Sequence, residues 1–325
     1  MHELEDVLKF CMFDFDLHKK YFMRHLFEPP QEYEHLESTR MLLLFYSLSA
    51  LKILHANHFD EFIAPMRSRA IEWIYSLQVQ PSKEQKYCGF IGSDSYINTV
   101  SFANVQDPTN LFDVAHLNST HLAILCLLIL KDDLCRLNRL AILETLKDLQ
   151  LSDGSFKFQT LEESESDNRF VYSASVICHL LEGWDYINMK AMAQFIKSCS
   201  NYDGGFGIRP GLESHAGSTF CAISSLKLME HDNPEFYKTQ DLVDIEKRVV
   251  YWLSKLQSGL GGFSGRANKD PDTCYCFWAY AALVQLGGGG FRFFDVTQDR
   301  RRGGFCKTPM DHIQIYIIAS SVSVH

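Results

Sequence analysis

The sequence lacks the features that mark several large classes of protein. Its formal net charge is −9 over 325 residues, so it has no general excess of the Lys and Arg that nucleic-acid binders set against phosphates. The longest apolar run, 41–54, is interrupted by Lys52 and falls short of the roughly 20 apolar residues of a membrane span. Residues 1–10 lack the basic start and apolar centre of a signal peptide. We expect a soluble, cytoplasmic protein without nucleic acid or a membrane span.

The sequence also lacks a disulfide-like cysteine framework. Its 10 cysteines include no C-x-x-C pair, and many lie inside apolar runs such as 121–130 and 176–181. Cysteines in such runs behave as small core residues in a reducing compartment. We therefore interpret most of them as reduced core thiols.

What is present is a repeated unit of two helices followed by a Gly-Phe turn. Hydrophobic residues make up 46% of the chain, which is ample for a large core. The apolar spacing predicts helices over 3–27, 38–54, 65–80, 116–130, 139–149, 169–181, 189–199, 214–229, 243–257 and 274–286. Gly-Phe turns lie at 89–90, 154–156, 204–206, 262–263 and 303–305. Units of roughly forty to sixty-five residues predict stacked helical hairpins in one all-α domain over 1–325. The pattern leaves an open solenoid and a closed ring as alternatives.

The stretch 261–278 concentrates polar and reactive side chains at one predicted helix start. Asp272 occupies the N-cap position, and Cys274 follows it in the first turn, where a helix N-terminus favours a thiolate. These two residues are either a cap beside a core cysteine or two ligands of one zinc ion. Arg266 and Lys269 in the preceding loop, with Tyr275, suit phosphate oxygens.

The run G-R-A-N-K-x-x-D-T-C-Y-x-F-W, residues 265–278, resembles the β subunits of the protein prenyltransferases, most closely those of protein geranylgeranyltransferase type I. The resemblance covers nearly the whole chain. It implies an α/α toroid with a central apolar cavity, and an enzyme that transfers a geranylgeranyl group from geranylgeranyl diphosphate to the cysteine of C-terminal C-a-a-X peptides. It also implies an α subunit as heterodimer partner and C-a-a-X proteins such as small GTPases as substrates.

The resemblance implies a role for individual residues. The diphosphate contacts would be His215, Arg266, Lys269 and Tyr275. The isoprenoid pocket would be lined by Arg169, Tyr172, Cys221 and Trp278, with Leu42 at the position that sets its length. The last peptide residue would contact His121, Ala123 and Phe170. Lys307 matches a lysine that takes the charge role of magnesium in the farnesyl enzyme, and this implies a magnesium-independent reaction.

The zinc ligands implied by the resemblance are Asp272, Cys274 and a histidine in a D-x-x-H-x-Y pattern. The matching segment, 311–316, has Gln314 at that histidine's place. His312 lies two residues earlier, about 200° around the axis of a helix. His312 could complete the site only if the local backbone shifts, so catalytic competence stays open.

Two further departures affect the ring and the pocket. Four glycines, 287–290, stand where a helical connection is expected, and the sequence ends at His325 where the family continues. Closure of the ring at its C-terminal side therefore stays open. Leu42 is intermediate between the small threonine of type I enzymes and the tryptophan of farnesyltransferase, so the isoprenoid length stays open as well.

Three alternative functions remain. The chain could be a non-catalytic variant that binds prenyl diphosphate or the α subunit. It could be the β subunit of farnesyltransferase or of the Rab-specific enzyme, which Lys307 and the match at His121 and Phe170 disfavour. A terpene cyclase is disfavoured because Asp132 and Asp133 have no matching partner motif.

Overall fold

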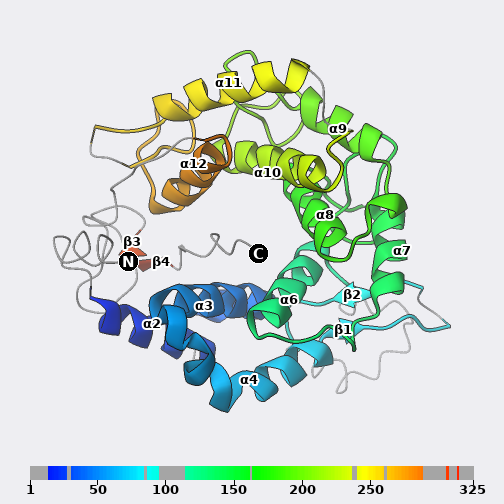
Figure 1. Ribbon diagram of the computed structural model, residues 1–325, viewed down its shortest axis with the longest axis vertical. Helices are drawn as coiled ribbons and strands as arrows, with labels where there is room; N and C mark the ends of the chain where they lie inside the picture. Colours follow the sequence, from blue (N-terminus) through cyan, green and yellow to red (C-terminus); the bar gives the residue numbers. More distant parts are fainter. Residues whose placement is uncertain are drawn as a thin grey trace.

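The computed structural model describes residues 14–27, 31–83, 86–94, 114–161, 163–235, 240–259, 262–287, 305–306 and 313–314. The described helices are arranged in a ring (Figure 1). They are α2 (Phe15–Phe27), α3 (Arg40–His55), α4 (Phe59–Ser76), α6 (Leu117–Ile129), α7 (Arg139–Leu149), α8 (Asn168–Leu180), α9 (Met189–Ser198), α10 (Ala216–Asp232), α11 (Gln240–Lys255) and α12 (Thr273–Gln285). Short 3-10 helices are η1 (Gln31–Thr39), η2 (Ala56–His58) and η3 (Trp184–Tyr186).

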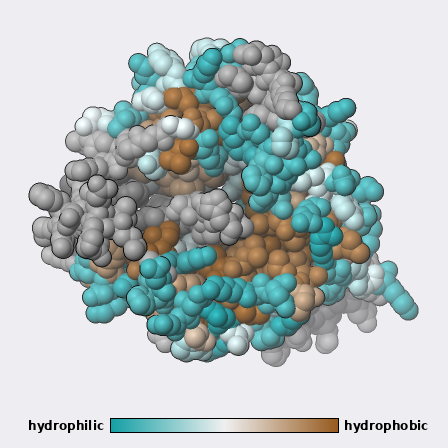
Figure 2. All heavy atoms as spheres, in the orientation of Figure 1, coloured by the Kyte–Doolittle hydropathy of each residue, from teal (hydrophilic) through white to brown (hydrophobic). Residues whose placement is uncertain are grey.

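The ring has an inner and an outer layer. Helices α3, α6, α8, α10 and α12 form the inner wall and pack on one another in chain order, while α4, α7, α9 and α11 lie outside them. Hydrophobic atoms gather on the inner side around α6 and beside α12, and hydrophilic atoms cover much of the outer rim (Figure 2). The α/α toroid predicted from the sequence is confirmed. No helix in the described ranges is both long and apolar enough to cross a membrane.

The amino-acid pattern explains the two layers. The inner helix α10 is buried over most of its length, from Ala216 to Met229, because its apolar and small residues surround the whole axis. The outer helices α7 and α9 bury one stripe and expose the opposite face. Each begins at an asparagine whose side chain accepts a backbone N–H three residues on, Asn138 from Ala141 and Asn188 from Ala191.

The Gly-Phe turns join each outer helix to the next inner one. Their phenylalanines, Phe90, Phe156, Phe206 and Phe263, are each at most 1% exposed. The carbonyl of Phe206 accepts the N–H of His215 at 3.0 Å. Gly204 has a φ of +101°, and a Cβ there would lie 2.6 Å from the Arg248 carbonyl oxygen of α11. Only glycine combines this left-handed backbone with so close an approach.

One expectation about the N-terminal third was wrong. The helix predicted to begin at Pro65 begins six residues earlier, with Pro65 inside α4. An interior proline lacks the N–H for one backbone hydrogen bond and crowds the preceding turn, yet α4 continues through Pro65 as one helix. Of the basic residues in α2, His18 and His25 are buried, at 0% and 2% exposure; a neutral imidazole can be buried where a lysine cannot.

The C-terminal part of the chain departs from the helix assumed for 311–316. Strand β3 (Phe305–Cys306) pairs antiparallel with β4 (Ile313–Gln314), with Phe305 opposite Gln314. Near the start of the ring, β1 (Gln78–Val79) pairs with β2 (Gly89–Phe90). Helix α12 ends before Gly287, whose φ is +81°. The remaining glycines of the run, 288–290, lie outside the described ranges, so the expectation about closure of the ring at this side stays a prediction.

Candidate active site

The starts of α10 and α12 meet through a histidine and a tyrosine. His215 is the N-cap of α10, where its Nδ1 accepts the backbone N–H of Gly217 at 3.1 Å. Its Nε2 lies 3.0 Å from the Tyr275 hydroxyl oxygen in the first turn of α12. Because Nδ1 accepts, the ring proton resides on Nε2, and His215 donates to Tyr275. The hydroxyl hydrogen of Tyr275 must therefore point to another acceptor.

Burial keeps this histidine neutral. Burial, and after it the positive charge of Arg266, lowers the pKa of His215, while Glu213 opposes the shift. A neutral imidazole with its proton on Nε2 is a fixed hydrogen-bond donor at neutral pH.

The loop before α12 is fastened to the start of α10. The backbone N–H of Ala216 donates to the Gly265 carbonyl at 2.9 Å, and the Ser264 hydroxyl donates to the Lys269 carbonyl at 2.5 Å. Arg266 is exposed and donates to Glu213 at 3.0 Å. The side chain of Lys269 is exposed as well. The loop thus carries two exposed cationic side chains, and the charge of one of them, Arg266, acts on His215.

Glu213 was missed in the sequence. Its place two residues before His215 was visible, but the contact with Arg266 spans 53 residues along the chain and depends on the fold.

Asp272 and Cys274 lie together at the start of α12, as predicted. Asp272 is the N-cap, 7% exposed, and its Oδ1 accepts the backbone N–H of Cys274 at 3.0 Å. Cys274 is partly exposed. Cys276 is buried, and burial raises the pKa of its thiol to about 12. Of the two thiols, Cys274 is therefore the one placed to act as a ligand.

The third zinc ligand is not placed. Gln314 lies in β4, and His312 lies outside the described residues, as does Lys307. The carboxylate of Asp272 and the thiol of Cys274 are donors that zinc accepts, and the helix N-terminus favours the thiolate. The two residues fit part of a zinc site.

Aromatic side chains form a continuous row along the inner wall. Tyr172 on α8 lies edge-on to Phe220 on α10, with ring centroids 5.3 Å apart. Phe220 in turn contacts Phe277 and Trp278 on α12, both at 5.1 Å. Such rings present apolar area with fixed geometry. Tyr172 and Trp278 were predicted as wall residues, while Phe220 and Phe277 were missed because every position of these helices reads as apolar.

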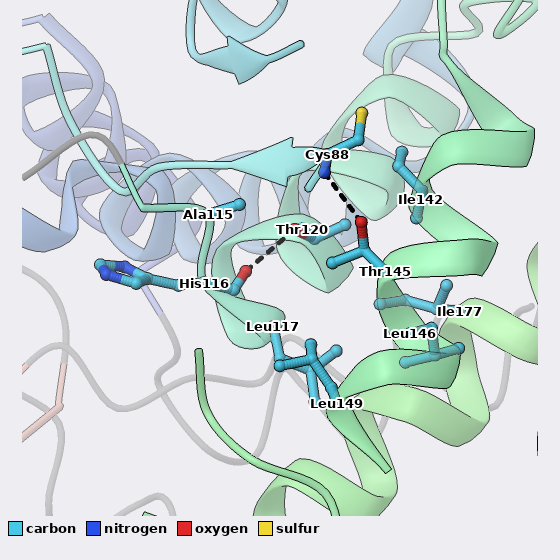
Figure 3. A pocket seen from close by; sticks show the side chains of 10 residues that line it. All are labelled: Cys88, Ala115, His116, Leu117, Thr120, Ile142, Thr145, Leu146, Leu149 and Ile177. Atoms are coloured by element: carbon cyan, nitrogen blue, oxygen red, sulfur yellow. Dashed lines mark hydrogen bonds between the residues drawn. The ribbon is translucent and has the colours of Figure 1, made fainter. Parts of the chain in front are cut away.

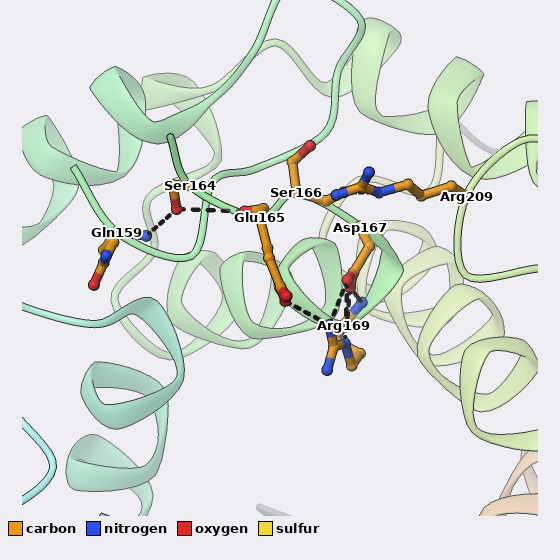
Figure 4. A network of polar contacts seen from close by, with 7 residues as sticks. All are labelled: Gln159, Ser164, Glu165, Ser166, Asp167, Arg169 and Arg209. Carbon is orange, nitrogen blue, oxygen red and sulfur yellow. Dashed lines mark hydrogen bonds and ion pairs between the residues drawn. The ribbon is translucent and has the colours of Figure 1, made fainter. Parts of the chain in front are cut away.

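Other residues predicted for the isoprenoid pocket differ in exposure. Cys221 is buried, and burial raises the pKa of its thiol to about 12. Leu42 is partly exposed on α3. Arg169 binds Asp167 at 2.6 Å and Glu165 at 3.0 Å through its guanidinium (Figure 4). A half-exposed guanidinium between two carboxylates is placed at a polar edge rather than in an apolar wall.

The three residues predicted to contact the peptide are buried in the described structure. His121 is 7% exposed, and its Nδ1 lies 3.3 Å from the Ser173 hydroxyl. Burial lowers the pKa of His121 to about 4. Phe170 is 3% exposed and Ala123 is fully buried. Their role as peptide contacts stays a prediction, and the burial of Ala123 does not support a direct contact.

Two cavities are lined by other residues. One of about 10 Å³ lies between Cys88, which precedes β2, and residues of α6, α7 and α8, among them Thr120 and Thr145 (Figure 3); it has room for about one water. A second, of about 310 Å³, lies between α2, α3 and α4, beside Arg40, Arg69 and Trp73. Neither is lined by a residue predicted for the active site.

Comparison with known proteins decides the family. Residues 13–322 match the model of the prenyltransferase alpha-alpha toroid domain. The chain belongs to this family. It is 33% identical to the geranylgeranyl transferase type-1 subunit beta of Arabidopsis thaliana, over 86% of this chain and 76% of that protein. It is 32% identical to the subunit of the same name in Dictyostelium discoideum, over 89% of this chain and 84% of the relative.

A solved structure supports the toroid independently. The chain superposes on Candida albicans protein geranylgeranyltransferase-I complexed with GGPP with a TM-score of 0.74 at 24% identity, covering 93% of this chain and 88% of the other. The resemblance inferred from residues 265–278 is thus confirmed at the level of the whole chain.

Proposed function

We propose that this chain is the β subunit of a protein geranylgeranyltransferase of type I. The enzyme would transfer a geranylgeranyl group from its diphosphate to the cysteine of a C-terminal C-a-a-X peptide. The names of the two type-1 relatives support the reaction. The observation that carries the proposal within this chain is the contact between His215 and Tyr275, with Arg266 and Lys269 in the adjoining loop.

The four residues would form the diphosphate site. His215 would orient the Tyr275 hydroxyl through its Nε2–H, Tyr275 would donate its own hydroxyl hydrogen to the diphosphate, and Arg266 and Lys269 would supply charge. Negative charge grows on the diphosphate as its bond to the isoprenoid carbon breaks, so donors fixed beforehand stabilise the transition state more than the ground state. The bonds from Gly217 to His215 and from Ala216 to Gly265 fix these donors before substrate arrives.

The row from Tyr172 through Phe220 to Trp278 would contact the isoprenoid tail. The tail is apolar along its length, and aromatic walls suit such a ligand. Leu42, on α3, would limit the length of the chain that fits. In this proposal the aromatic row binds the isoprenoid tail, Leu42 limits its length, and the loop before α12 binds the diphosphate leaving group.

Asp272 and Cys274, with a third ligand, would hold zinc. Zinc bound there would favour the thiolate form of the peptide cysteine, which is the nucleophile at neutral pH. Asp272 orients the first turn of α12 through its bond to the Cys274 N–H, so the metal ligand Cys274 and the diphosphate ligand Tyr275 are held in adjacent positions.

Further components follow from the proposed reaction. An α subunit would complete the enzyme, and proteins ending in C-a-a-X would be its substrates, with leucine favoured as the last residue. Lys307 would take the role of magnesium near the diphosphate.

The test is zinc content and transfer measured on one sample. The full chain is co-expressed with a prenyltransferase α subunit, zinc per chain is determined, and transfer of labelled geranylgeranyl to a peptide ending in Cys-Val-Leu-Leu is followed. We expect transfer that does not require added magnesium, and loss of transfer in Cys274→Ala with prenyl diphosphate binding retained. Bound diphosphate without transfer would instead identify a non-catalytic binding variant.

The same assay separates the nearer enzyme alternative. Farnesyl and geranylgeranyl diphosphate are offered together at equal concentration. Preferential farnesyl transfer would replace the proposal by a farnesyltransferase β subunit, and Leu42→Thr should then shift the preference toward the longer donor.

A further inference from the structure

A second cluster of metal-ligating side chains lies at the far ends of α8 and α10. His179 Nδ1 lies 2.7 Å from Asp232 Oδ2, and His231 Nδ1 lies 2.8 Å from Asp232 Oδ1. Within the described ranges, these three residues meet a simple criterion for a metal site. Each offers one ligand atom, and the three ligand atoms all lie within 4.8 Å of one another. The indole N–H of Trp184 also donates to Asp232 Oδ2, at 2.7 Å.

The cluster is separate from the candidate active site. Asp232 is the last residue of α10, which is 17 residues long, and His215 caps the opposite end. At 1.5 Å per residue the two ends lie about 25 Å apart. His179 is likewise in the last turn of α8.

Two helix C-termini converge on the cluster. The unsatisfied carbonyls of a helix C-terminus carry partial negative charge, so each helix favours a cation at this place. The side chains of His179 and Asp232 are 23% and 21% exposed, whereas His231 is 75% exposed. The site is therefore partly shielded from water and open on the His231 side.

We propose that His179, His231 and Asp232 form a second zinc site, one that fastens α8 to α10 on the face of the ring away from the candidate active site. Two imidazole nitrogens and one carboxylate oxygen are a ligand set that zinc accepts, with the fourth position left to water. For zinc to bind at both Nδ1 atoms, each neutral imidazole must carry its ring proton on Nε2, so the two Nδ1 contacts with the carboxylate are replaced by bonds from Nδ1 and from the carboxylate to zinc.

Trp184 is an outer partner of the proposed site, meaning a residue that binds a metal ligand, Asp232, without binding the metal itself. Its indole N–H holds Asp232 Oδ2, and hydrogen bonds of this kind orient a carboxylate toward a metal. Trp184 is 8% exposed and lies in η3, directly after α8. The outer partner is thus fixed by packing before metal arrives.

The test uses cobalt(II) as the spectroscopic probe on the full chain carrying Cys274→Ala. That substitution removes the thiolate proposed for the other site, so cobalt bound at the new site gives visible ligand-field bands without near-ultraviolet sulfur-to-cobalt charge transfer. We expect one cobalt per chain, displaced by zinc. His231→Ala added to Cys274→Ala should abolish this binding, and Trp184→Phe should weaken it about tenfold.

The control is His58→Ala in the same background. The side chain of His58 is 79% exposed, and its Nδ1 lies 3.7 Å from the carboxylate of Glu61. It therefore resembles His231 as an exposed histidine beside a carboxylate, but among the described residues it belongs to no group of three metal-ligating side chains. It should leave the cobalt titration unchanged. No cobalt binding in the Cys274→Ala chain, or equal binding with and without His231, would overturn the proposal. Failure of geranylgeranyl transfer would leave this titration unaffected, so the two proposals fail separately.

Discussion

Gly265 lies against the face of the Tyr275 ring, so closely that a Cβ at position 265 would be 2.2 Å from the ring carbon Cζ. The absence of a side chain at Gly265 is therefore what lets the loop before α12 close over Tyr275. The carbonyl oxygen of Gly265, in the same loop, accepts the N–H of Ala216. The position of the phenol thus depends on a residue that bears no functional group.

Gly265→Ala is expected to displace Tyr275 and break its contact with His215. Forcing a methyl group into a filled space costs about 1–3 kcal/mol of unfolding free energy, and prenyl diphosphate affinity should fall with it. Urea unfolding and fluorescence titration measure the two effects. Gly259→Ala is the control, because a Cβ there meets nothing within 4 Å; equal behaviour of the two variants would show that the ring is not held by the glycine.

Substitutions of Arg266 and Glu213, the two partners of the exposed ion pair, are expected to change the affinity for prenyl diphosphate in opposite directions. Arg266→Gln removes a charge-assisted hydrogen bond of about 1.5–3 kcal/mol to the diphosphate. The affinity of the chain for prenyl diphosphate should therefore fall by roughly 10- to 100-fold. Glu213→Gln frees Arg266 and removes a nearby negative charge, so affinity should rise by up to about fivefold. Stability should hardly change in either variant. A fall in affinity for Glu213→Gln would contradict the placement of the diphosphate at Arg266.

The chain should lose stability as pH falls below 6.5, in part through His121. Burial holds the pKa of His121 in the folded chain at about 4, below the ordinary histidine value of 6.5. Between these values the unfolded chain binds a proton that the native chain does not, so the contribution is present above pH 6.5 and lost as pH falls toward 4. Over the whole interval from pH 6.5 to 4, this loss of unfolding free energy amounts to about 3 kcal/mol.

The measurement is urea unfolding at pH 7 and pH 5 for the wild type and His121→Asn. Asparagine keeps a polar atom near Ser173 but does not titrate. The variant should lose less stability between the two pH values than the wild type. Identical pH dependence would assign the loss to other groups.

Alanine variants of two glycines distinguish the cost of a left-handed backbone from the cost of a steric clash. Gly204 and Gly211 both have positive φ, +101° and +78°, but a Cβ at Gly211 meets nothing within 4 Å, whereas one at Gly204 meets the Arg248 carbonyl. Gly211→Ala should cost about 1 kcal/mol from the left-handed backbone alone. Gly204→Ala should cost more, since α11 must also shift. Equal unfolding midpoints in urea would refute the close approach of this turn to α11.

The helices were predictable from the sequence because their ends carry local signals. Asn138, Asn188 and Asp272 cap the helices that follow them, and the Gly-Phe turns end each unit, so most boundaries were placed within a few residues. Pro65 misled because a helix start and a tolerated interior proline read alike when only neighbouring residues are compared. Packing on α3 decides between them.

The candidate site was predictable only where its parts are adjacent in sequence. Asp272, Cys274 and Tyr275 fall within one turn, and the resemblance added His215. The contact of Arg266 with Glu213 and the row through Phe220 depend on which helices become neighbours. On an inner helix that is apolar on every side, no periodicity marks the face that lines the ring.

The backbone at the inner helix starts has a wider consequence. His116, His215 and Asp272 each donate their N–H to a buried phenylalanine, Phe90, Phe206 and Phe263 respectively, at 3.0 Å. The main chain therefore holds the N-cap residue of each of these inner helices in the same way, through a bond that does not depend on the side chain there. The backbone position of each helix start is thus set by the preceding Gly-Phe turn, which leaves the side chains of His215 and Asp272 to cap their helices and to face the candidate site.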